Sequence, residues 1–204
     1  MRSKKYLEIF LEGVPDFHDP SPALEQYITP APIAADLIYT AYFSGHIDGK
    51  DVVDLGCGTG MLSAGAALLG GRVAGVDIDK NAVDLAENFF AERRLEAAFL
   101  CADVAEFGER CDTVVMNPPF GAQKKHADRK FIDKSCEIAN FIYCICLKEN
   151  ERFVMNRYDE NGFEVEKLEE HKLPLMRRFN FHTKARVDYS VSILRGCKHV
   201  GFSG

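Results

Sequence analysis

The 204-residue sequence contains no apolar run that approaches the roughly 20 residues of a membrane-spanning helix. Its first five residues are followed by acidic residues and not by the apolar core of a signal peptide. A chain of this length can form one well-packed domain and is short for two. We therefore expect a soluble, cytoplasmic protein that folds as a single domain over residues 1–204.

Cysteine pairs at metal-binding spacing are also missing. The seven cysteines include no Cys-x-x-Cys pair, and most of them lie in apolar segments typical of strands or helices. Reduced, buried thiols are the default at such positions. We expect no zinc site.

The sequence has no overall excess of positive charge. A formal net charge of -6 argues against indiscriminate nucleic-acid binding, although a local basic surface can still attract RNA. Basic residues gather in two segments, which comprise Lys124, Lys125, Arg129 and Lys130, and then Arg177, Arg178, Lys184 and Arg186 with His182 among them. Such runs are more often simply solvated surface.

The order of predicted elements indicates an α/β protein. In residues 1–49, the apolar spacing predicts helices over 4–13 and 31–43, and the prolines indicate an extended segment over 15–32. From residue 51 strand and helix signals alternate, which is typical of a parallel sheet with crossover helices. The predicted strands are 52–55, 72–76, 97–101, 112–116, 141–147, 163–173 and 187–195. We assign residues 50–196 to this core.

A glycine-rich turn follows the first predicted strand. Its residues, Gly56 to Gly60, would let the backbone approach a ligand closely at the start of the next helix. Asp77 ends the second predicted strand, where a carboxylate can accept hydrogen bonds from ribose hydroxyls. The glycine spacing differs from that of the dinucleotide fingerprint, so the turn is weak evidence alone and becomes strong together with Asp77, Asp103 and the loop after the fourth predicted strand.

The fourth predicted strand ends in Asn117-Pro118-Pro119-Phe120. Proline restricts its own backbone and that of the preceding residue, so this loop is stiff. The side-chain carbonyl of Asn117 and the backbone carbonyl of Pro118 are two acceptors that suit a planar NH2 group, and Phe120 offers a stacking surface. The alternative is a structural turn with Phe120 folded into the core.

These segments together resemble an S-adenosylmethionine-dependent amino-methyltransferase. The resemblance rests on Asp54 to Gly60 followed by Asn117 to Phe120. It narrows to rRNA adenine-N6 methyltransferases of the methyltransferase-like-five type through residues 24–29, 76–79, 101–104 and 181–184, and it covers most of residues 1–195. This sequence departs from the family pattern in having Thr59 and Met61 where a Cys and a Val can occur.

The family resemblance implies a fold and a site. The fold is a Rossmann-like, seven-stranded class I methyltransferase sheet in the order 3-2-1-4-5-7-6, with strand seven antiparallel and helices on both faces. The catalytic residues would be Asn117, Pro118, Pro119 and Phe120. The cofactor-binding residues would be Gln26, Tyr27, Thr29, Asp54, Gly56, Gly58, Thr59, Gly60, Met61, Asp77, Ile78, Asp103 and Val104. RNA would contact Lys124, Arg177, Arg178, His182 and Lys184.

By the same resemblance, the substrate is an adenosine in structured RNA, and the resemblance implies small-subunit rRNA. A small zinc-binding activator protein would pair with the edge strand 97–101, which carries neither charge nor proline. The alternatives are methylation of a protein glutamine or of guanine N2, and a non-catalytic RNA-binding assembly factor. Enzymes acting on glutamine typically have Tyr at the position of Phe120 and a larger N-terminal substrate domain.

Overall fold

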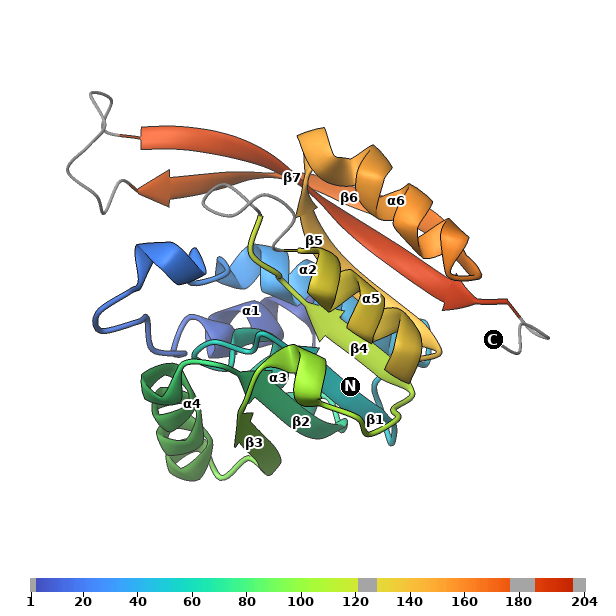
Figure 1. Cartoon of the computed structure of the whole chain (residues 1–204). Helices are drawn as coiled ribbons and strands as arrows, with labels where there is room; N and C mark the ends of the chain where they lie inside the picture. Colours follow the sequence, from blue (N-terminus) through green and yellow to red (C-terminus); the bar gives the residue numbers. More distant parts are fainter. Residues whose placement is uncertain (1–2, 121–127, 177–185, 200–204) are drawn as a thin grey trace.

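The computed structural model describes residues 3–120, 128–176 and 186–199 (Figure 1). Its α-helices are α1 (Lys4–Leu11), α2 (Ala31–Phe43), α3 (Met61–Leu68), α4 (Lys80–Arg93), α5 (Arg129–Ile138) and α6 (Glu151–Glu160). Its strands are β1 (Asp51–Leu55), β2 (Arg72–Asp77), β3 (Ala97–Cys101), β4 (Thr113–Met116), β5 (Phe141–Leu147), β6 (Phe163–Met176) and β7 (Arg186–Lys198). Short 3-10 turns are η1 (Pro22–Leu24), η2 (Val104–Glu106) and η3 (Lys148–Asn150).

The seven strands form one sheet in the order β3-β2-β1-β4-β5-β7-β6, which confirms the predicted fold class. The pairs from β3 to β5 are parallel, whereas β7 runs antiparallel to both β5 and β6. Strands β6 and β7 are longer than predicted and continue as a hairpin beyond the rest of the sheet (Figure 1). The predicted strands ended at Leu173 and Arg195 because the next residues, Pro174 and Gly196, are typical strand breakers.

Alternating strand residues fill two separate cores. Val114 and Met116 of β4 point to one face of the sheet, and Val115 points to the other. The first face is covered by α5 and α6, and the second by α1 to α4. Both faces are therefore apolar, as a parallel sheet requires, and all four residues of β4 are buried. Within the described residues, no helix is long and apolar enough to cross a membrane.

The strand β3 forms one edge of the sheet. Phe99 turns inward, where its ring meets that of Phe90 of α4 edge to face, with 4.9 Å between the ring centroids. Leu100 turns outward and is 48% exposed, and Cys101 beside it is also exposed. In the part of the chain that the structure describes, β2 is the single strand that pairs with β3.

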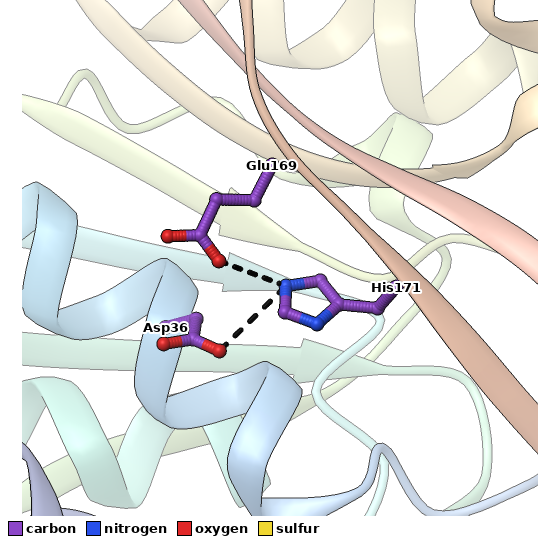
Figure 2. Close-up of side chains that lie close together, drawn as sticks. All are labelled: Asp36, Glu169 and His171. Atoms are coloured by element: carbon purple, nitrogen blue, oxygen red, sulfur yellow. Dashed lines mark ion pairs between the residues drawn. The ribbon is translucent and has the colours of Figure 1, made fainter.

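A buried carboxylate joins the N-terminal helices to β6, the edge strand opposite β3. Asp36 of α2 is 8% exposed, and its side chain accepts a hydrogen bond from the Lys4 ammonium group of α1. His171 of β6 places Nε2 3.6 Å from the second oxygen of Asp36 and 3.1 Å from a carboxylate oxygen of Glu169. Figure 2 shows this ring nitrogen facing both carboxylates. Asp36, Glu169 and His171 lie close enough together to hold a metal ion, but the ammonium group of Lys4 already supplies positive charge to Asp36. We therefore interpret these four residues as an anchor between α1, α2 and β6.

Replacing Asp36 with Asn should lower the free energy of unfolding by about 1–2 kcal/mol, because Lys4 and His171 lose the charge that they face. Urea unfolding measures the change. Asp84→Asn is the control, since Asp84 pairs with Lys80 on the exposed surface of α4 and should have little effect. Equal stability of the two variants would show that the Asp36 group anchors nothing.

Candidate active site

The glycine turn after β1 forms the floor of a cavity at the carboxyl ends of the strands. Gly56, Gly58 and Gly60 all have positive φ, at 74°, 53° and 91°. The amides of Gly56 and Cys57 both donate to the carbonyl of Val76, at 2.8 and 3.1 Å, which ties the turn to β2. Glycine is needed here because other residues rarely adopt this backbone conformation.

Two acidic side chains lie beside the turn. Asp77 accepts hydrogen bonds from the backbone amides of Gly58 at 2.8 Å and Asp79 at 2.9 Å, although burial still raises its pKa. Asp54 is 1% exposed and accepts from both the amide and the hydroxyl of Ser63, at 2.8 and 2.6 Å. Burial outweighs these bonds and raises the pKa of Asp54 to about 7. Both carboxylates are thus held beside the turn by backbone amides.

The cavity has a volume of about 580 Å³, within the range of small-molecule and cofactor sites. Twelve of the predicted cofactor residues line it: Gln26, Tyr27, Thr29, Asp54, Gly56, Gly58, Thr59, Met61, Asp77, Ile78, Asp103 and Val104. Gly60 does not, because it begins α3 and packs against α4, where an added Cβ would lie 3.1 Å from Ala86. Acceptors beside a glycine floor and apolar walls fit a nucleoside-containing cofactor such as S-adenosylmethionine.

The proline loop closes one end of the cavity. Asn117 and Pro119 line it, whereas Pro118 and Phe120 do not. Phe120 is 8% exposed, and its ring meets Tyr27 with 5.4 Å between centroids. The loop thus has both expected features, an amide at the cavity and an aromatic ring beside it, but the ring is packed into the core in this conformation.

Asp103 has two partners besides its place in the cavity wall. Its carboxylate accepts from the amide of Ala105 at 3.0 Å and so caps η2. Lys130 of α5 reaches both of its oxygens, at 3.0 and 2.8 Å. Lys130 itself lines the cavity, so a ligand that bonds to Asp103 must share the carboxylate with this ammonium group.

Sequence reasoning missed several wall residues, chiefly Phe17, Leu62, Lys130 and Phe131. Phe17 lies near the start of the proline-rich segment and against Gly58, while Phe131 lies against Gly56. Isolated aromatic residues in a loop or a helix carry no local signal for such contacts. The predicted RNA-binding residues Lys124, Arg177, Arg178, His182 and Lys184 lie outside the described residues.

Comparisons with known proteins agree with this geometry. A family model described as the methyltransferase small domain matches residues 37–140. The rRNA N(6)-adenosine-methyltransferase METTL5 of Danio rerio is 32% identical over 94% of this chain and 97% of its own. A solved structure of PH1948 from Pyrococcus horikoshii, proposed to be an RNA methyltransferase, is 43% identical with a TM-score of 0.90, covering 98% of this chain and 100% of that one.

A more distant neighbour supports the fold alone. Magnesium protoporphyrin IX methyltransferase from Synechocystis, solved with S-adenosylmethionine bound, is 20% identical with a TM-score of 0.63 and covers 81% of this chain and 78% of that one.

The sheet order and the cavity at its carboxyl edge define a class I methyltransferase, an enzyme dependent on S-adenosylmethionine. More particularly, the chain belongs to the methyltransferase small domain family and, within it, groups with the METTL5-type proteins. The expected enzyme class, fold and cofactor are thereby confirmed.

Gly58→Ala should weaken S-adenosylmethionine binding by roughly tenfold, about 1.4 kcal/mol. The added Cβ would lie 2.9 Å from the ring of Phe17, a wall residue that would have to move, and a φ of 53° also strains alanine by about 1–2 kcal/mol. Calorimetric titration measures the affinity.

Gly49→Ala is the matched control for this substitution. Its φ is 67° and nothing lies within 4 Å of the added Cβ, so it imposes the backbone strain without moving a wall residue. Cofactor affinity should be unchanged in this variant. Equal losses of affinity in both variants would mean that strain alone, and not the Phe17 contact, shapes the cavity.

Proposed function

We propose that this protein transfers a methyl group from S-adenosylmethionine to the N6 amine of an adenosine in structured rRNA. The observation that carries the proposal is the amide of Asn117 at the end of the cofactor cavity, in a loop stiffened by two prolines. The similarity to METTL5 over nearly the whole chain supports adenosine as the target. Small-subunit rRNA and a cytoplasmic location complete the proposal.

The chemistry requires alignment more than acid–base catalysis. The cofactor supplies a methyl group already activated by its sulfonium. The amine of adenine is a weak nucleophile, because its lone pair is delocalised into the ring. The side-chain carbonyl of Asn117, which lines the cavity, would favour a pyramidal nitrogen and share its developing positive charge. The predicted second acceptor, the carbonyl of Pro118, belongs to a residue outside the cavity lining. The adenine must leave its stack to reach Asn117, which costs least in a loop or single strand.

The other candidates account for fewer of the observations. Enzymes that methylate glutamine typically have Tyr where this chain has Phe120, and the family similarity here spans the entire fold of an RNA enzyme. Guanine also carries an exocyclic amine, so methylation at guanine N2 is an outcome to be tested. A non-catalytic assembly factor would bind the cofactor and RNA without turnover.

Nucleoside mass spectrometry after incubation of rRNA with labelled S-adenosylmethionine tests the function. Label in N6-methyladenosine is the expected result. Label in N2-methylguanosine or only in protein would replace the proposed reaction with one of its alternatives. Mapping methylation sites in cells that lack the protein, against wild type, identifies the nucleotide and the ribosomal subunit.

Replacing Asn117 with Ala should lower turnover by roughly a hundredfold or more, because one preorganised acceptor for the amine is lost. Cofactor affinity should change little, since the glycine turn is untouched. Single-turnover methyl transfer and calorimetric titration measure the two quantities. Wild-type turnover in this variant would show that the proline loop is only structural.

We further propose that a small protein pairs with the free edge of β3 and extends the sheet, and that it is a zinc-binding activator. The exposed Leu100 and Cys101 on this edge, with Ile78 nearby at 51% exposed, support an apolar docking surface. Edge pairing supplies main-chain hydrogen bonds, and exposed side chains supply specificity.

Leu100→Lys should abolish that complex and leave cofactor binding intact. Its side chain is exposed, so the charge disturbs an interface without disturbing the core. Co-purification from the native host, with mass spectrometry and zinc analysis of the partner, measures the complex. Ile9→Lys on α1 is the control, because Ile9 is 57% exposed on another surface. A wild-type protein that is monomeric and fully active without a partner would contradict the proposal that an activator pairs with β3.

A further inference from the structure

The side chain of Asn117 is held at both ends by the segment that precedes α2. We call residues 25–30 the strap. Tyr27 donates its hydroxyl to Oδ1 of Asn117 at 2.9 Å. Nδ2 of Asn117 donates to the hydroxyl oxygen of Thr29, also at 2.9 Å. The strap and the proline loop are far apart in sequence, so these two bonds are long-range contacts that connect the cofactor wall with the reacting loop.

The surroundings of both hydroxyls favour these roles. Burial raises the pKa of Tyr27 well above its ordinary value, so the phenol stays protonated and can donate. Its ring also contacts Phe120, which places the hydroxyl against the proline loop. Thr29 is 7% exposed, so water does not readily replace its bond to Asn117.

The strap is itself anchored at its other end. Gln26 donates from Nε2 to a carboxylate oxygen of Asp79 at 2.7 Å, and its own Oε1 accepts from the amide of Ser21 at 2.7 Å. Asp79 caps α4 and follows Asp77 by two residues. The strap therefore spans from the end of β2 to the end of β4, and its position is fixed at both.

The direction in which the amide faces matters for the proposed reaction. A carbonyl oxygen has two acceptor positions, and Tyr27 uses one, which leaves the other for the target amine. If the amide turned by half a rotation, its N–H groups would face the N–H groups of the amine. Donors would then oppose donors, and the nitrogen could not be aligned.

We propose that Tyr27 and Thr29 are positioning residues, which hold the carbonyl oxygen of Asn117 toward the amine that is methylated. This role goes beyond forming a wall of the cofactor cavity. It rests on the proposed function for the identity of the amine, but the hydrogen bonds themselves can be tested without it.

Tyr27→Phe and Thr29→Val each remove one bond to Asn117 and preserve the size of the side chain. Methyl transfer to rRNA at saturating cofactor should slow by roughly tenfold or more, because small misplacements of a reacting group are costly. Calorimetric affinity for S-adenosylmethionine should change little. Tyr39→Phe is the control: it removes a hydroxyl on α2 from a residue that does not line the cavity, and activity should be retained.

The double variant Tyr27→Phe/Asn117→Ala separates positioning from packing. Once Asn117 is gone, removal of the Tyr27 hydroxyl should cause no further loss of turnover, because coupled residues are not additive. Two results overturn the proposal: additive losses, or single variants that raise the cofactor dissociation constant while turnover at saturation stays at the wild-type level.

A measurement without substrate distinguishes this proposal from the proposed function. The side-chain NH2 signals of Asn117 in a 1H–15N spectrum are assigned from their absence in Asn117→Ala. They should shift in Tyr27→Phe and in Thr29→Val and stay in place in Tyr39→Phe. Unshifted signals in the first two variants overturn the positioning role. A wild-type enzyme that leaves rRNA unmethylated overturns the proposed function alone.

Discussion

The parallel pairing of β1, β2 and β4 is the constraint on which the site depends. Leu55 is in register with Val76, and Asp54 is in register with Val115, so the three strands end at the same edge of the sheet. The residues that come next in each strand are therefore neighbours, although the chain separates them widely. The glycine turn, Asp77 and Asn117 meet at one cavity because of this register.

The sheet edge supplies only part of the cavity, and the N-terminal segment completes it. Residues 23–29 form a continuous part of the lining, opposite the turn after β1. They remain there because α2 is docked through an inner surface that is apolar apart from Asp36, and because Asp36 joins α2 to α1 and β6. The position of the strap thus depends on packing outside the cavity.

Local signals in the sequence were sufficient for the five parallel strands, the glycine turn and Asp77, because each is set by neighbours along the chain. The proline loop was a candidate site from its own residues, and the family resemblance added the strap. It could not indicate that Tyr27 and Thr29 bond to Asn117, since that pairing depends on how α2 docks. Nor could it indicate Phe17 against Gly58, or the Lys130 ammonium on Asp103. Contacts between distant segments depend on packing, which no local pattern encodes.

The proline loop is fixed at both of its ends. Asn117 is held by the strap, and the carbonyl of Phe120 accepts a hydrogen bond from the side chain of Asn150 at 3.2 Å. Asn150 stands at the N-cap of α6, but its side chain is directed to the loop and makes no capping bond. Two prolines restrict the residues between these anchors. A methyl transfer that requires alignment, and neither metal nor strong base, is the kind of reaction that such a rigid loop can serve, because little ordering remains to be done when the substrate arrives.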